Sequence, residues 1–163
     1  MPLDEIMAAM ICAVDDGVGE ILAELKRNNL FEDTIVFFQS DNGPSRESRN
    51  WMDGSRDPYY GGSAGIFKGH KYSLFEGGIR VPGIISYPAK IPQGQVLSAP
   101  CAAMDLFPTL CSFAGISCAG YELDGLDISG ILTDDAPSPH DMVFWEMDGQ
   151  AAVRQGNYAN TCV

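Results

Sequence analysis

The sequence is poor in basic residues: 10 lysines and arginines stand against 22 acidic residues, and the formal net charge is −12. Because phosphate groups are bound mainly by Lys and Arg, this balance argues against nucleic acid or an anionic membrane surface as the main partner. No apolar run approaches the roughly 18 residues of a membrane span, and the first 30 residues lack the pattern of a signal peptide. From the 163 residues as given, we therefore expect no targeting signal.

Paired cysteines are also missing. The five cysteines are an odd number at irregular spacings, and no C-x-x-C pair points to zinc or redox chemistry. We expect most of them to be buried thiols. The 163 residues, 45% of them hydrophobic, are enough for one globular domain that buries roughly 70% of its unfolded surface.

The basic residues that are present gather in one segment. Seven of the ten lie within residues 46–90, whereas residues 121–148 hold eight acids and no Lys or Arg. A cationic segment in an acidic protein favours a small anionic ligand, and a solvated basic loop is the alternative.

The apolar pattern predicts an α/β protein. Residues 4–28 have apolar side chains at helical spacing, and residues 34–38 form a short apolar run typical of a strand buried on both faces. This order predicts a parallel α/β sheet. Further along, we expect a strand at residues 83–86, a short helix ending at Gly115, and a hairpin around Asp148-Gly149.

The motif S-D-N-G follows the first predicted strand and has two interpretations. A hairpin turn fits poorly, because Pro44 cannot donate to a strand ladder and residues 44–65 show no alternating pattern. An Asx turn that closes the strand is the common explanation. The other interpretation is a ligand site, since Asp41 and Asn42 stand at the carboxyl end of a strand and carry the hard oxygen donors that Ca²⁺ or Mg²⁺ prefers.

A second motif, KGHKYSLFEGGIRVP at residues 68–82, combines basic side chains with paired glycines. The glycines predict a backbone that needs close approach or positive φ, and Lys71 is a compact charge suited to an anion. The alternative is an exposed basic loop with a structural His70.

Four segments together resemble the C-terminal half of a type I sulfatase, in the alkaline-phosphatase-like superfamily: TIVFFQSDNG, GHKYSLFEGGIRVPGIISYPAKIPQG, DLFPTLCSFAGI and LDGLDISGIL. The resemblance covers residues 6–158, and FWEMDGQAAVRQGNY is similar to the start of the small C-terminal subdomain of those enzymes. It implies part of an alkaline-phosphatase-like sheet with flanking helices in residues 1–118. It also implies a truncated antiparallel subdomain in residues 119–163, into which residues 159–163 do not fit.

The resemblance also implies roles for individual residues. Asp41 and Asn42 match two of the four protein ligands of the catalytic cation, usually Ca²⁺ rather than Mg²⁺. Lys71 matches the lysine that contacts the sulfate and stabilises charge on the ester oxygen, and we expect His70 beside it to bind substrate. His70 and Tyr72 replace glycines that many members have beside this lysine.

The nucleophile of the family is not present in the 163 residues. Its signature, C-x-P-x-R or S-x-P-x-R, supplies the residue oxidised to formylglycine, and no such motif occurs here. We therefore expect a fragment, an incomplete gene model or a degenerate relative that is inactive by itself. The resemblance implies an extracytoplasmic or lysosomal enzyme, while the 163 residues leave the compartment unknown.

The expected substrate is a sulfated small molecule or a sulfated sugar. Aromatic and basic side chains of residues 44–67 are candidates for contacting it: Arg46, Arg49, Trp51, Arg56, Tyr59 and Tyr60. Two alternatives stay open, namely a phosphatase or phosphonate monoester hydrolase of the same superfamily and a non-catalytic truncated relative.

Overall fold

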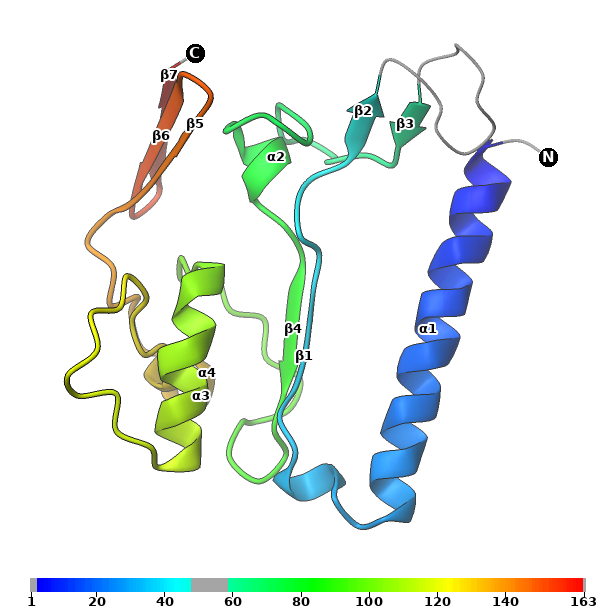
Figure 1. Ribbon diagram of the computed structural model, residues 1–163, viewed down its shortest axis with the longest axis vertical. Helices are drawn as coiled ribbons and strands as arrows, with labels where there is room; N and C mark the ends of the chain where they lie inside the picture. Colours follow the sequence, from blue (N-terminus) through cyan, green and yellow to red (C-terminus); the bar gives the residue numbers. More distant parts are fainter. Residues whose placement is uncertain (1–2, 48–58, 163) are drawn as a thin grey trace. The chain divides into compact units, whose positions relative to one another are not determined.

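The computed structural model describes residues 3–47 and 59–162, in two compact units, Met1–Ala89 and Lys90–Val163 (Figure 1). The fold is mixed α/β with small sheets. All strand pairs among the described residues are antiparallel, so the prediction of a parallel sheet is wrong for this part of the chain. The predicted division between residues 118 and 119 stays a prediction.

The first unit begins with helix α1, Leu3–Arg27, which confirms the helix predicted from apolar spacing. The Asn28 side chain donates to the Glu24 carbonyl at 2.9 Å and satisfies one of the last carbonyls of the helix. More than half of each of the Met10 and Ile21 side chains is exposed, so an apolar stripe of α1 is uncovered. No helix in the described ranges is long and apolar enough to cross a membrane.

The 3₁₀ turn η1, Phe31–Asp33, leads into strand β1, Val36–Gln39, which pairs with β4, Gly83–Ser86, through Phe38↔Ile84 and Gln39↔Gly83. Both strands were predicted. Burial of β1 on both faces was not confirmed, since Phe38 is 44% exposed. An apolar run indicates that a strand can be covered, but it does not supply the covering element. A helix before a strand likewise leaves the direction of the neighbouring strand open.

Residues 44–65, for which no strand was predicted, contain β2, Ser45–Glu47, paired with β3, Tyr59–Gly61. β1 and β2 do not pair with each other, which confirms that the motif S-D-N-G is no hairpin turn. The candidate substrate residues Arg49, Trp51 and Arg56 lie outside the described residues. The short helix α2, Glu76–Ile79, precedes β4.

The second unit holds most of the buried apolar side chains. The 3₁₀ turn η2, Ala103–Asp105, continues into α3, Leu106–Ala114, and Gly115 ends this helix with φ 69°, as predicted. Helix α4, Ser129–Asp134, was not predicted. The buried apolar residues of the unit come from both helices, from strands β5 and β6, and from loop segments: Ile91, Phe113, Ile128, Ile131, Leu132, Val143 and Ala152.

A three-stranded sheet, in the order β5-β6-β7, ends the chain: Val143–Met147, Gln150–Gln155 and Tyr158–Cys162. The β5–β6 hairpin turns at Asp148 and Gly149, whose φ values of 49° and 79° are those of a type I′ turn, and this confirms the prediction. β7 was not expected, because residues 159–163 lay outside the resemblance. The cysteine prediction is wrong: Cys12, Cys101 and Cys162 are exposed, and the other two are half-buried.

Candidate functional site

Two loops meet where β1 ends and β4 begins: residues 40–44, the β1 loop, and residues 68–78, the lysine loop. The antiparallel pairing places Gln39 beside Gly83, so the segments that flank this end of the pair come together. Backbone hydrogen bonds join the loops, from the Gly43 amide to the Gly78 carbonyl and from the Lys71 amide to the Pro44 carbonyl, each 2.9 Å long. The two motifs singled out in the sequence therefore form one unit.

Glycines make this close contact possible. A Cβ atom on Gly43 would lie 2.8 Å from the Gly77 carbonyl carbon and 2.9 Å from the Gly78 Cα, well inside van der Waals distance. A Cβ atom on Gly77 would lie 2.6 Å from the carbonyl oxygen of Gly69, within the lysine loop. Gly43 and Gly77 are required because the neighbouring backbone leaves no room for a side chain at either position. Of the two reasons that the sequence offered, close approach rather than positive φ applies to the Gly77-Gly78 pair.

Both backbone polar groups of Lys71, the amide and the carbonyl, form hydrogen bonds. Its amide donates to Pro44, and its carbonyl oxygen accepts from the His70 Nδ1 at 2.7 Å. Because a carbonyl can only accept, Nδ1 carries the hydrogen, and the neutral His70 ring has its lone pair on Nε2. The Lys71 Nζ lies 5.3 Å from the centroid of the Tyr72 ring.

Tyr72 has a backbone that its residue type disfavours. Its φ is 70°, in the left-handed region, which costs an L-residue other than glycine roughly 1–2 kcal/mol. Strain of this kind persists only where surrounding contacts hold it, and it is often found at functional sites.

Asp41 and Asn42 provide two oxygen donors on the β1 loop. Asp41 is exposed, and the Asn42 Nδ2 donates to the Gly43 carbonyl at 2.8 Å. This bond uses the amide nitrogen, so Oδ1 is the side-chain atom of Asn42 that suits a hard cation. The described residues contain no group of three or more His, Cys, Asp or Glu side chains able to hold a metal ion. The pair fits Ca²⁺ as part of a ligand set that further oxygen donors must complete.

The structure thus brings Asp41, Asn42, His70 and Lys71 onto two joined loops. Whether the side chains of Asp41, Asn42 and Lys71 face one cleft stays a prediction, as do the roles of all four residues.

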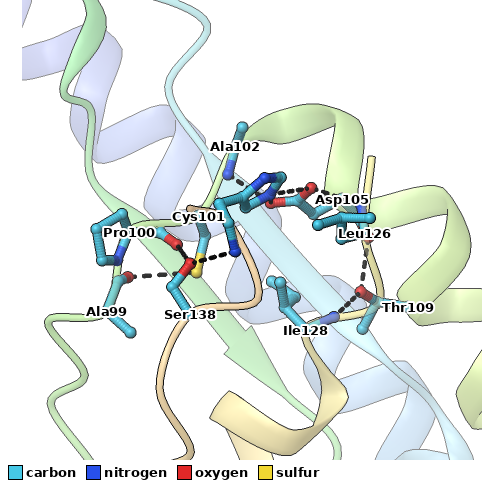
Figure 2. Close-up of polar contacts among 10 residues, drawn as sticks. Ala99, Pro100, Cys101, Ala102, Asp105, Thr109, Leu126, Ile128 and Ser138 are labelled. Atoms are coloured by element: carbon cyan, nitrogen blue, oxygen red, sulfur yellow. Dashed lines mark hydrogen bonds and ion pairs between the residues drawn. The ribbon is translucent and has the colours of Figure 1, made fainter. Parts of the chain in front are cut away.

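A second polar cluster, in the other unit, was missed from the sequence. The Asp105 side chain is fully buried and accepts from the amides of Ala102 at 2.7 Å and Leu126 at 2.9 Å. The His140 Nε2 lies 2.8 and 2.9 Å from its two oxygens, and only 5% of the His140 side chain is exposed (Figure 2). One carboxylate therefore joins three segments that are distant in sequence.

Neighbouring hydroxyl groups extend this cluster. The Thr109 hydroxyl donates to the Asp105 carbonyl at 2.6 Å and accepts from the Ile128 amide at 3.0 Å (Figure 2). The Ser138 hydroxyl donates to the Pro100 carbonyl at 2.6 Å. A buried carboxylate and hydroxyl with partners on all sides indicate a structural cluster. In the sequence, the position of Asp105 directly before the predicted helix was a usable signal for a helix cap. Nothing in the sequence points to His140 as the partner of this carboxylate.

The Cys101 thiol lies beside this cluster, and its surroundings do not activate it as a nucleophile. Although the Cys101 residue as a whole is exposed, desolvation of its thiol by nearby atoms, and after it the charge of Asp105, raises the pKa of this thiol to about 11. Because the thiolate is the reactive form, the environment of Cys101 disfavours nucleophilic chemistry.

Comparison with known proteins gives independent evidence on the family of the chain. A family model described as "Sulfatase" matches residues 7–116, which include both joined loops. Mouse steryl-sulfatase is 38% identical over 133 residues, which are 80% of this chain and 21% of that protein. The PsFucS1 sulfatase from Pseudoalteromonas sp. matches 90% of this chain and 28% of its own, with 30% identity and a TM-score of 0.71.

One further match shows similarity in fold without close similarity in sequence. The phosphonate monoester hydrolase SpPMH from Silicibacter pomeroyi matches 87% of this chain and 29% of its own, with a TM-score of 0.64 and 22% identity. The chain spans only between a fifth and three tenths of the length of these proteins. Since the family model covers most of the 163 residues, the chain belongs to the sulfatase family.

Proposed function

We propose that this chain supplies part of the divalent-metal and sulfate-binding site of a sulfuric ester hydrolase. Asp41 and Asn42 are the metal ligands, and Lys71 and His70 bind the sulfate group. The observation that supports this most strongly is the 2.9 Å hydrogen bond from the Lys71 amide to Pro44. In a member of the sulfatase family, it joins the loop with the oxygen donors directly to the loop with the lysine.

The cation of the proposed site is Ca²⁺, for which a carboxylate and an amide oxygen are suitable ligands. When bound, Ca²⁺ stabilises negative charge on the sulfate oxygens. Asp41 contributes a negative charge to the site, and Asn42 presents Oδ1 because its nitrogen is bonded to Gly43. The nucleophile, a formylglycine, comes from outside these 163 residues, which hold no C-x-P-x-R motif.

Lys71 stabilises the charge that develops on the ester oxygen as the sulfur–oxygen bond breaks. Its backbone is fixed by hydrogen bonds to Pro44 and His70, so the point from which its side chain extends is set before the substrate binds. His70 has Nδ1 bonded to a carbonyl, which leaves Nε2 for the substrate. Sulfate oxygens only accept hydrogen bonds, so this contact requires the protonated ring.

The substrate class is a sulfated small molecule or a sulfated sugar. Sulfatases such as mouse steryl-sulfatase are the relatives at the higher identities, whereas the phosphonate monoester hydrolase resembles the chain in fold alone. This difference favours sulfate esters over phosphoryl substrates. A phosphatase or phosphonate monoester hydrolase, and a non-catalytic relative, are the alternatives.

Steady-state kinetics of the full-length protein test this proposal. With Ca²⁺ present, we expect kcat/KM for p-nitrophenyl sulfate to exceed the values for p-nitrophenyl phosphate and a phosphonate monoester. Lys71→Ala should lower kcat by about 10²-fold or more, the usual cost of losing one preorganised contact to a developing oxyanion. Lys68→Ala is the matched control, because its ammonium lies over the Phe75 ring at 3.9 Å. A preference for phosphoryl esters, or equal effects of the two lysine variants, contradicts the proposal.

A further inference from the structure

We propose that Cys111 and Cys118 form an intramolecular disulfide bond when a disulfide oxidant such as glutathione disulfide is present. The bond joins the end of helix α3 to residues 116–121, the segment that follows the helix. The inference is independent of the roles proposed for the β1 loop and the lysine loop, because both cysteines belong to the second unit, Lys90–Val163.

The first argument is that the two thiols are neighbours. A hydrogen bond with Cys111 is the largest cause that raises the pKa of the Cys118 thiol, followed by desolvation and by the charges of Cys111 and Asp127. Both cysteines are half-buried and have free thiols. The exposed Cys101 thiol, by contrast, donates to the Ala99 carbonyl at 3.4 Å. Cys111 and Cys118 are therefore adjacent before any oxidation, and a small oxidant can reach them.

The second argument is the way in which α3 ends. Gly115 has φ 69°, and its amide donates to the Ser112 carbonyl at 3.1 Å. The Ile116 amide donates to the Cys111 carbonyl at 2.9 Å. These are the two hydrogen bonds of a Schellman motif, in which the chain reverses after a left-handed glycine. The reversal directs the segment with Cys118 back along the last turn of the helix, the turn that carries Cys111.

The third argument is that Cys118 has a fixed place on its other side. The Tyr121 amide donates to the Cys118 carbonyl at 3.2 Å and closes a turn. Asp127 accepts hydrogen bonds from the Ser112 side chain of α3 and from the Ser129 amide, and its charge acts on the Cys118 thiol. Cys118 therefore lies close to both the end of α3 and Asp127, so its contact with Cys111 does not depend on one bond alone.

The segment after α3 has room for the small movement that a disulfide requires. The two sulfurs of a disulfide are about 2.05 Å apart, closer than two hydrogen-bonded thiols, so the side chains must rotate and the segment must shift. Ile116 is 61% exposed and Tyr121 is 73% exposed, so little packing opposes this shift.

The reaction is a thiol–disulfide exchange in two steps. One cysteine thiolate attacks a sulfur of glutathione disulfide, forms a mixed disulfide and releases one glutathione. The other thiolate then attacks the protein sulfur of the mixed disulfide and releases the second glutathione. The protein thiols lose two electrons and two protons, which the glutathione disulfide takes up. Since the raised pKa of the Cys118 thiol makes its thiolate scarce at neutral pH, the pair suits a slowly formed structural bond rather than a rapid redox sensor.

The test is disulfide mapping of the full-length protein after equilibration with excess glutathione disulfide. Remaining thiols are blocked with N-ethylmaleimide in denaturant. Chymotrypsin, which cleaves after aromatic residues such as Phe113, then separates the two cysteines before mass spectrometry. We expect more than about half of Cys111 and Cys118 in one linked pair of peptides, whose mass is two hydrogens below the sum of the reduced peptides. Retention of both thiols, glutathione on each of them, or a link from either to a different cysteine overturns the inference.

Two serine variants serve as matched controls. Cys111→Ser should abolish the link and leave Cys118 as a thiol or as a mixed disulfide with glutathione, whereas Cys101→Ser should leave the link unchanged. In the wild type, oxidation should slow hydrogen exchange of the Tyr121 amide at least about threefold, because this amide bonds to Cys118. Unchanged exchange in the linked protein overturns the claim that the bond holds residues 116–121 to the helix.

Discussion

The close contact between the β1 loop and the lysine loop predicts that Gly43 tolerates no side chain. A Cβ atom there would lie 2.8 and 2.9 Å from backbone atoms of Gly77 and Gly78, where ordinary contact begins at 3.4 Å. Backbone cannot rotate away as a side chain can, so Gly43→Ala must separate the loops. Overpacking of this kind costs about 1–3 kcal/mol, and the lost Gly43–Gly78 hydrogen bond adds roughly 0.5–1.5 kcal/mol.

Amide hydrogen exchange measures this loss locally. The Lys71 amide is bonded to Pro44 across the same loop contact, so its exchange reports on separation of the loops. The combined loss of about 1.5–4.5 kcal/mol corresponds to exchange that is about 10- to 2,000-fold faster. Gly17→Ala is the control, because nothing lies within 4 Å of a Cβ atom at Gly17. Unchanged exchange of the Lys71 amide in Gly43→Ala would refute the account of the joined loops.

Three further predictions concern the buried cluster and the isolated chain. Asp105→Asn should lower the free energy of unfolding by about 3 kcal/mol or more, since it disrupts a buried pair with His140, whereas the exposed Asp124→Asn should stay within about 0.5 kcal/mol of wild type in urea unfolding. In iodoacetamide labelling at pH 8, Cys101 should react on the order of 100-fold more slowly than an ordinary thiol, because its pKa is raised to about 11, and labelling as fast as that of the exposed Cys12 would contradict this. The 163-residue chain alone should bind a hydrophobic dye and show no turnover of p-nitrophenyl sulfate, and a stable monomer without dye binding would contradict the first expectation.

Local elements were predictable from the sequence where local chemistry determines them. Apolar spacing predicts α1, a glycine stop predicts the end of α3, and Asp148-Gly149 predicts the β5–β6 turn. The partner of β1 was not predictable, because 43 residues, 40–82, separate β1 from β4, and pairing depends on this whole segment. β2 and β3 lie in polar, glycine-rich sequence that carries no alternating pattern.

The candidate site was predictable in part for a similar reason. Asp41, Asn42 and Lys71 stand in short motifs with recognisable order, and the need for glycine in the lysine loop followed from its paired glycines. The structure adds the hydrogen bonds that join the loops and the left-handed conformation of Tyr72. The hydrogen bonds that join the loops cannot be read from residue types, because they link segments that are distant in sequence. The conformation of Tyr72 belongs to a local turn, closed by the hydrogen bond from the Ser73 amide to the His70 carbonyl.

The central claim is that the two joined loops form one metal- and sulfate-binding site, and a crystal structure of the full-length protein grown with Ca²⁺ and sulfate tests it most directly. The account predicts a Ca²⁺ ion about 2.3–2.6 Å from side-chain oxygens of Asp41 and Asn42. It also predicts a sulfate oxygen about 2.7–2.9 Å from the Lys71 Nζ. A cation bound elsewhere, or a Lys71 side chain directed away from the oxygens of Asp41 and Asn42, would contradict it.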